Sequence, residues 1–230
     1  WFTHGSPTYF TNYKSWMWKR AKGFMDVVAY TGSSSAGNLT INHSLGVAPE
    51  LIISKSRSNA QAWSVLFNMG ASSYQYFTTL GTAPDYGSGR SYGSGYLASK
   101  PTDTAYAIKT DTGIGSGNNY IAYLFATLAG ISKVGSYTGN GSNQTINCGF
   151  SAGSRFILIK RVNNSGDWYF WDSVRGIVAG NDPHLSLNTS AAQVTSDDSV
   201  DPHNSGFIVN QVSATNINVS SEEYLFYAIA

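Results

Sequence analysis

Five short motifs occur twice in this chain, in the same order and about 105 residues apart. Tyr30-Thr-Gly32 recurs as Tyr137-Thr-Gly139, and Trp63 recurs as Trp168. The other pairs are Thr40-Ile-Asn42 with Thr145-Ile-Asn147, 51–55 with 156–160, and 120–126 with 224–230. A constant spacing of this length predicts that the chain is built from two copies of one structural unit.

The first residues of the chain fit the end of the same pattern. Asn12-Tyr13 stands as far before Asn119-Tyr120 as the other motifs stand apart, and Trp16-Met-Trp18 takes the place of Tyr123-Leu-Phe125. This segment has the character of a closing strand, which belongs to a preceding unit or is exchanged with a partner. The predicted division is residues 1–22 as that strand, 23–130 as β-domain copy 1 and 131–230 as β-domain copy 2.

The composition restricts the unit to β-structure. Only 12% of the residues are charged, against about 25% in an average soluble domain, while 14% are aromatic and 24 are Gly. Few helix-forming residues exclude a helical bundle, and 42% apolar content excludes disorder. Short apolar runs alternate with Gly, Asn and Ser turns, a pattern typical of antiparallel sheets. We expect an all-β fold of two tandem, related antiparallel β-sandwich-like domains, which either stand separately or share a sheet.

The run 167–171 indicates how one of these strands is used. In a strand, Trp168 and Phe170 point to one face, and Tyr169 and Trp171 point to the other. Large aromatic residues on both faces predict that the second face meets another strand, another subunit or a ligand.

The charge pattern limits the partners. The net charge is +1, so no basic field attracts nucleic acid, and no apolar run is long enough to span a membrane. Residues 1–22 carry +4 and residues 176–230 carry −6, which either helps neighbouring subunits associate or reflects one basic end of a longer protein. Cys148 is the only cysteine, so an intrachain disulfide is excluded and a small buried side chain is expected.

Several motifs together resemble an uncharacterised family of tailed-bacteriophage tail-fibre and virion structural proteins with duplicated β-domains. They are the runs 16–32, 41–53, 120–126, 165–168, 172–183 and 185–188. The resemblance implies a structural or receptor-binding role on the virion, an extracellular particle, with assembly into a homo-oligomer and contacts to other virion proteins. It implies no catalytic residues, because none are established for that family.

The acidic loop of the second copy is the best candidate for a metal site. Asp182, Asp197, Asp198 and Asp201 are the candidate carboxylates, with His184 and His203 close to them in sequence. Oxygen ligands at this density suit Ca²⁺, although the spacing matches no known calcium loop. A solvated acidic turn, in which Asp and Asn bond the local backbone, is the preferred interpretation. We therefore expect no bound metal and no cofactor.

Enzymatic motifs are absent from the sequence. It contains no Gly-x-Ser-x-Gly elbow, no P-loop and no His-Glu-x-x-His motif, so we expect no enzyme. A pair of carboxylates that cleaves polysaccharide remains the third functional alternative.

Aromatic residues in variable loops suggest a second alternative, the binding of a host-surface glycan. Tyr and Trp rings stack on sugars, and the candidates are Tyr86, Tyr92, Tyr96 and Trp171. These residues equally suit a core or a protein interface, and the repeated pair Trp63 and Trp168 has the pattern of core residues. The leading expectation is a virion structural protein, with glycan recognition second and a depolymerase third.

Overall fold

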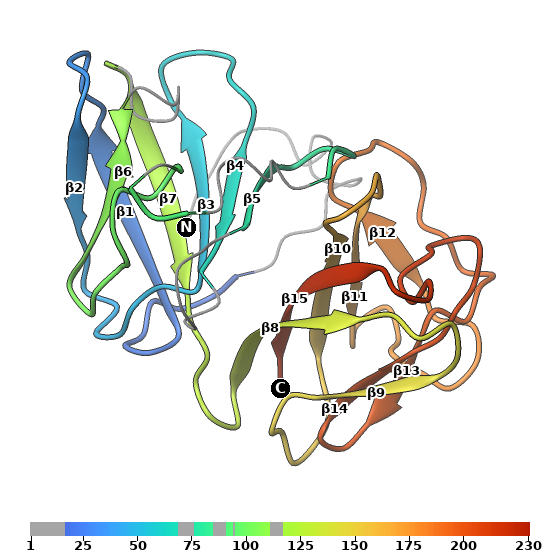
Figure 1. The fold of residues 1–230 in the computed structure, drawn as a ribbon. Coiled ribbons are helices and arrows are strands. Elements are labelled where there is room, and N and C mark those ends of the chain that lie inside the picture. The colour runs from blue at the N-terminus through green and yellow to red at the C-terminus, as the bar shows by residue number, and fades with distance from the viewer. Residues whose placement is uncertain (1–16, 69–75, 85–90, 94, 111–116) are drawn as a thin grey trace, which may run out of the picture.

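The computed structural model describes residues 17–68, 76–84, 91–93, 95–110 and 117–230. These residues form fifteen strands joined by turns, and they contain no α-helix (Figure 1). All strand pairs are antiparallel, so the expected all-β, sandwich-like fold is confirmed. Within the same ranges, no helix is available that could cross a membrane.

Seven of the strands lie in the first half of the chain and eight in the second. The first half contains β1 (Met25–Thr31), β2 (Asn38–Asn42), β3 (Leu51–Ser56), β4 (Ser64–Phe67), β5 (Tyr76–Thr79), β6 (Ala105–Lys109) and β7 (Asn119–Phe125). The second half contains β8 (Ser132–Thr138), β9 (Gln144–Asn147), β10 (Phe156–Arg161), β11 (Trp168–Asp172), β12 (His184–Ser186), β13 (Val200–His203), β14 (Gly206–Val209) and β15 (Glu223–Ile229).

The two halves use the same strand order. One five-stranded sheet has the order β1-β7-β3-β4-β5, and the other, read from its corresponding edge, has the order β8-β15-β10-β11-β12. The pairing register also corresponds, since Leu51 opposes Phe125 while Phe156 opposes Ile229. The halves differ in the small outer sheet, which is β2-β6 in the first half and β13-β14-β9 in the second. Descent of the halves from one duplicated unit stays a prediction.

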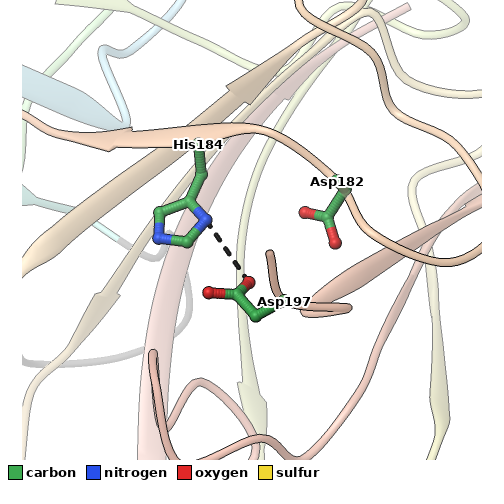
Figure 2. A group of neighbouring side chains, drawn as sticks. All are labelled: Asp182, His184 and Asp197. Atoms are coloured by element: carbon green, nitrogen blue, oxygen red, sulfur yellow. Dashed lines mark ion pairs between the residues drawn. The ribbon is translucent and has the colours of Figure 1, made fainter. Parts of the chain in front are cut away.

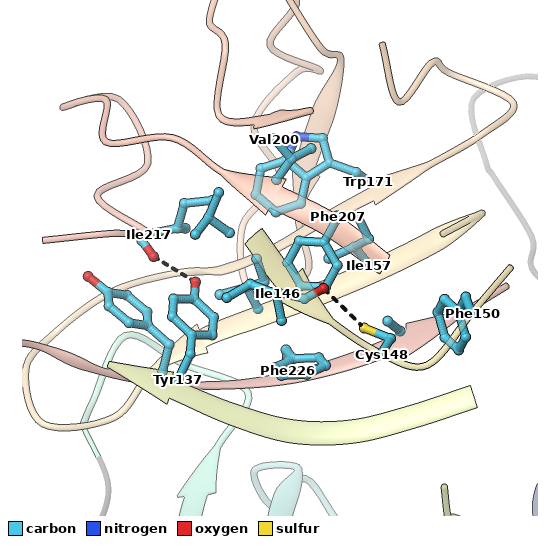
Figure 3. Packing of buried hydrophobic residues seen from close by; sticks show 14 residues of the cluster. Tyr137, Ile146, Cys148, Phe150, Ile157, Trp171, Val200, Phe207, Ile217 and Phe226 are labelled. Carbon is cyan, nitrogen blue, oxygen red and sulfur yellow. Dashed lines mark hydrogen bonds between the residues drawn. The ribbon is translucent and has the colours of Figure 1, made fainter. Parts of the chain in front are cut away.

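Three apolar clusters fill the spaces between the sheets. The first half has a core between its five-stranded sheet and β2-β6, and the second has one between its sheet and β13-β14-β9 (Figure 3). In the second core, the Tyr137 hydroxyl donates to the Ile217 carbonyl at 2.6 Å. Cys148 lies in the same core, as expected, and burial raises the pKa of its thiol to about 12.

A third core lies between the two five-stranded sheets. The halves therefore share no sheet, but they share apolar packing. Leu51 and Val65 of the first half pack in one cluster with their sequence counterparts Phe156 and Phe170 of the second. Trp168 also belongs to this cluster, while Trp171 belongs to the core behind the sheet, so the expected alternation along β11 is confirmed.

Polar contacts fasten the halves together beside this shared core. The fully buried Lys160 ammonium donates to the carbonyls of Gly81 at 3.2 Å and Thr82 at 3.3 Å, both in the first half. It also donates to the Gly166 carbonyl at 2.5 Å. Burial lowers the pKa of Lys160 to about 8, against the opposing effect of Asp167. The Trp168 indole adds a hydrogen bond to the Thr79 carbonyl at 3.0 Å.

The turn before β1 has the geometry of the turn that connects the halves. Ala21 bridges Met25, with an N–H to carbonyl distance of 3.0 Å, and Leu128 bridges Ser132 at 3.1 Å. Gly23 and Gly130 occupy the same position in these turns, with φ angles of 75° and 73° that favour glycine. The local structure thus continues the sequence pattern as far back as Ala21, while residues 1–16 lie outside the described residues.

Candidate functional site

The structure brings together three side chains of the acidic region, of which Asp182 and His184 are neighbours in the sequence and Asp197 follows 13 positions later. Asp182 lies in the loop before β12, His184 is the first residue of β12, and Asp197 lies in the loop that leads to β13 (Figure 2). One potential ligand atom from each lies within 4.8 Å of the others. Among the described residues, this is the group of His, Cys, Asp and Glu side chains with metal-ligand spacing.

Asp182 is fully buried, and only one of its oxygens has a partner. Oδ1 accepts hydrogen bonds from the backbone N–H groups of Ser199 at 2.7 Å and Val200 at 3.2 Å. Oδ2 is buried without a hydrogen-bond partner. Burial raises the pKa of Asp182 to about 7, and the two N–H donors reduce this effect. The expected solvated turn is therefore wrong for this residue.

His184 and Asp197 face each other beside Asp182. His184 Nδ1 lies 3.4 Å from Asp197 Oδ1, which also accepts a 2.8 Å hydrogen bond from the Ser199 hydroxyl. His184 Nδ1 and Asp197 Oδ2 have no hydrogen-bond partner. The imidazole is fixed between Tyr169 and Trp171, with ring centroids 5.4 and 5.3 Å away. Burial lowers the pKa of His184, against the opposing charge of Asp197.

The other predicted ligands have different roles. The Asn210 side-chain amide donates to Asp198 at 2.8 Å and to Asp201 at 2.9 Å. Asp201 also accepts the Gly180 N–H at 3.3 Å, from a residue 21 positions earlier, so this bond joins two loops and does not belong to a local turn. His203 Nδ1 lies 3.0 Å from the Ser205 hydroxyl. The sequence analysis therefore named the right region of the chain. Of its candidate ligands, the structure brings Asp182, His184 and Asp197 together, whereas Asp198, Asp201 and His203 have other contacts.

A cavity of about 220 Å³ reaches this group from one side. His184 and Asp197 form part of its wall, and Tyr169 and Val194 contribute apolar surface. The cavity gives a small ion or molecule a path to two of the three side chains. Asp182 lies behind them, in the interior.

Of the predicted sugar-binding residues, the three that the structure describes all pack against an apolar core. Tyr86 lies outside the described residues. Tyr92 and Tyr96 are half-buried against the first-half core, where the Tyr92 hydroxyl donates to Asn68 and the Tyr96 ring stacks on Phe77. Trp171 is fully buried, so the expectation that its ring meets a sugar is corrected.

An apolar cleft between the halves was missed in the sequence. It has a volume of about 580 Å³ and is lined by apolar and aromatic side chains from both five-stranded sheets and from the segment before β1. Trp18 lies there, edge-on to Phe125 and Phe156 with ring centroids 5.5 Å away. Trp63 lines the same cleft and is 37% exposed, so the expected core position holds for Trp168 alone. Only the meeting of the two sheets creates this surface.

Comparison with known proteins gives a family without a described function. No curated protein and no solved structure matches the chain. The model of the family described as Domain of unknown function (DUF7483) matches residues 11–230, which includes both halves and part of the segment before β1. The chain therefore belongs to the DUF7483 family.

Proposed function

We propose that the chain is a structural component of a virion appendage, such as a phage tail fibre, and that it acts by self-association and not by catalysis. The resemblance of its sequence motifs to tail-fibre and virion structural proteins suggests that the chain is part of a virion. The apolar cleft supports the self-association, and it is the observation on which this proposal rests.

The cleft combines a large apolar surface with exposed side chains that a monomer leaves in water. Met17 is 94% exposed, and Trp18 and Trp63 are each 37% exposed. Exposed aromatic and Met side chains that surround an apolar hollow are typical of a protein interface. Within one chain, the two halves already pack together through corresponding faces of their five-stranded sheets. Such a sheet face is therefore able to pack against a second sheet of the same kind.

The charge distribution favours a second copy of the chain as the occupant. Residues 1–22, of which Met17 and Trp18 line the cleft, carry +4, whereas residues 176–230 carry −6. The basic segment of one copy can therefore lie next to the acidic segment of another, and this attraction favours association of two copies in that orientation.

The oligomeric state tests this proposal. We expect light scattering and native mass spectrometry to show a homo-oligomer at micromolar concentration, and the double variant Met17→Ser, Trp18→Ala to dissociate it. Val174→Ser is the matched control, because Val174 is 93% exposed and does not line the cleft. A monomeric wild-type protein, or equal effects of the two changes, contradicts self-association through the cleft. Mass spectrometry of purified virions tests the location separately.

Glycan binding is the second candidate, and a different place in the structure favours it. A cavity of about 270 Å³ in the second half is lined by Arg161, Asp167, Tyr169 and Asn216, among others. An aromatic ring beside charged and amide groups is the combination that recognises sugar hydroxyls.

A glycan array with matched variants tests this candidate. Arg161 lines the cavity and pairs with Glu222 at 2.8 Å, but Glu222 is not part of the cavity wall. Both Arg161→Gln and Glu222→Gln break this ion pair, but only Arg161 lines the cavity. We therefore expect Arg161→Gln to reduce glycan binding and Glu222→Gln to retain it. Absence of binding by the wild-type protein rejects this candidate. Assaying the bound glycans for new reducing ends tests the depolymerase alternative.

A further inference from the structure

We infer that Asp182, His184 and Asp197 bind one divalent transition-metal ion, for which Zn²⁺ is the best match. The site lies in the second half, away from the apolar cleft, so the inference does not depend on the proposed self-association.

Buried atoms without partners carry the argument. Asp182 and His184 are 0% and 3% exposed, and the Asp197 side chain is 11% exposed. Asp182 Oδ2, Asp197 Oδ2 and His184 Nδ1 are buried and have no hydrogen-bond partner. An unpartnered polar atom in the interior costs about 1–3 kcal/mol, and proteins leave few of them. Figure 2 shows His184 and Asp197 facing each other with Asp182 beside them, and one ligand atom of each lies within 4.8 Å of the others, so a single cation can contact all three side chains.

The spacing of these atoms fits one ion. Zn²⁺ bonds of about 2.0–2.2 Å to nitrogen and oxygen place two ligands of a tetrahedral ion roughly 3.4 Å apart. His184 Nδ1 and Asp197 Oδ1 are separated by 3.4 Å. The three potential ligand atoms all lie within 4.8 Å of one another, so a small side-chain movement brings Asp182 to the same ion.

The donor set selects the class of metal. An imidazole nitrogen suits Zn²⁺ and its first-row neighbours, whereas Ca²⁺ and Mg²⁺ prefer oxygen ligands throughout. Two carboxylates and one imidazole match a Zn²⁺ ion, with a fourth position open to water from the adjoining cavity of about 220 Å³.

The surrounding groups already hold the ligands in place. Ser199 fixes both carboxylates, through its N–H to Asp182 and its hydroxyl to Asp197. Tyr169 and Trp171 fix the His184 ring from two sides. Such outer contacts orient the ligands of a metal and raise its affinity.

The ion would join two segments of the second half, residues 182–184 and the loop that contains Asp197. Asp182 ends the loop after β11, His184 begins β12, and Asp197 precedes β13. The direct backbone contacts here are the hydrogen bonds of Asp182 N–H to the Asp197 carbonyl at 2.9 Å and of His184 with Val194 at 3.1 Å. A metal at this point has a structural role, because it fixes the long 187–199 loop to the sheet.

Metal binding to the full chain tests the inference. The protein is stripped with a chelator, dialysed against Zn²⁺, and analysed by elemental mass spectrometry and calorimetry, with Mn²⁺, Ca²⁺ and Mg²⁺ in parallel. We expect one Zn²⁺ per chain, weaker binding of Ca²⁺ and Mg²⁺, and a higher Tm with Zn²⁺ than without it. Binding releases protons and orders the ligands, so the heat of binding depends on buffer and pH.

Two variants and a control separate the site from general acidity. Asp182→Asn keeps an oxygen acceptor for Ser199 and Val200, and Asp197→Asn keeps one for the Ser199 hydroxyl. Each is expected to weaken Zn²⁺ binding by about 100-fold or more, because loss of an outer contact alone costs about 10–100-fold. Asp198→Asn removes the same charge from a residue bound to Asn210 and is expected to retain Zn²⁺.

The same measurements can overturn the inference. If the wild-type protein takes up no metal, the inference is rejected, and the three side chains are a buried polar cluster held by Ser199 and by the aromatic rings of Tyr169 and Trp171. If Asp198→Asn weakens Zn²⁺ binding as much as Asp182→Asn does, binding is a general effect of negative charge. Preference for Ca²⁺ over Zn²⁺ rejects the proposed role of His184. Circular dichroism of the metal-free variants shows whether each of them is folded.

Discussion

At the scale of single residues, buried charged groups connect segments that are distant in the sequence. Asp26, Lys160 and Asp182 are nearly or fully buried. Asp26 contacts the loop after β2, Lys160 contacts the opposite half, and Asp182 contacts the start of β13. The sequence contains few charged residues, so these positions are informative: each has backbone partners that offset the cost of burial.

Asp26 gives a prediction about acid stability. It accepts the N–H groups of Ser44 at 2.7 Å and Val27 at 2.8 Å and pairs with Arg20. Burial alone would raise the pKa of Asp26, but these partners outweigh it and lower the pKa below 3.8. The folded state therefore holds the charged form, and its contribution to stability, present above about pH 4, is lost as the pH falls through the lowered pKa.

We expect Asp26→Asn to reduce the free energy of unfolding at pH 7 by about 1–3 kcal/mol. The difference from wild type should shrink between pH 4 and pH 2, as measured by urea denaturation. Asp103→Asn, at an exposed position, is the control and should have little effect. A constant difference between Asp26→Asn and wild type down to pH 2 would contradict this interpretation.

Cys148 gives a prediction about reactivity. Cys148 is 6% exposed and burial raises the pKa of its thiol to about 12, so little thiolate forms at pH 8. We expect the native protein to react very slowly with an aromatic disulfide reagent and to react fully in denaturant. A Cys introduced at the exposed Ser142 should react quickly under the same conditions. Fast native reaction of the wild-type thiol would show that Cys148 is accessible.

At the scale of elements, the close pairing of β9 and β14 depends on a missing side chain. A Cβ at Gly206 would lie 2.2 Å from the Ile146 carbonyl oxygen and 3.0 Å from the Cys148 nitrogen, both in the backbone. Backbone atoms in a paired strand cannot move aside without breaking the ladder. The corresponding pair in the first half, Asn42 with Ala105, accommodates a methyl group, so the requirement for glycine belongs to the second half alone.

We expect Gly206→Ala to lower the free energy of unfolding by about 2 kcal/mol or more, because the strands must separate to admit the methyl group. Gly81→Ala is the control, since its Cβ meets only the Thr79 side-chain oxygen at 3.3 Å. Urea denaturation of both variants provides the comparison. Equal stabilities of the two variants would show that β14 can shift without cost.

At the scale of the whole molecule, the shared core makes the two halves one cooperative structure. Phe170 is 1% exposed and packs in the cluster that contains Leu51 and Val65 of the other half. Lys160 and Trp168 add hydrogen bonds to the first half. Neither half can lose its structure without exposing the inner face of the other.

We therefore expect a single thermal transition, with calorimetric and van't Hoff enthalpies that agree. Phe170→Ala should destabilise this transition as a whole by about 3–5 kcal/mol, because it leaves a cavity between the sheets. Differential scanning calorimetry measures both effects. Two separate transitions, of which Phe170→Ala shifts only one, would show that the halves unfold independently.

Features that depend on neighbouring residues could be predicted from the sequence, whereas features that depend on contacts between distant residues could not. The faces of β11 were predicted correctly, because alternation along a strand is a local property. Trp63 was wrongly expected in the core, because its exposure depends on how the two sheets meet. Asp182 and Asp197 were named as candidates, but nothing local distinguishes them from Asp198 and Asp201.

The sequence by itself determined that the protein is all-β and that its two halves follow the same order of motifs, because strand patterns and repeats are written in neighbouring residues. Tertiary structure decided which faces are hidden. It joined the halves through a common core, packed Tyr92 and Tyr96 against the first-half core and Trp171 in the second-half core, and assembled His184 with Asp182 and Asp197. These outcomes depend on the closure of long loops and on the packing of sheet against sheet, which no local pattern encodes.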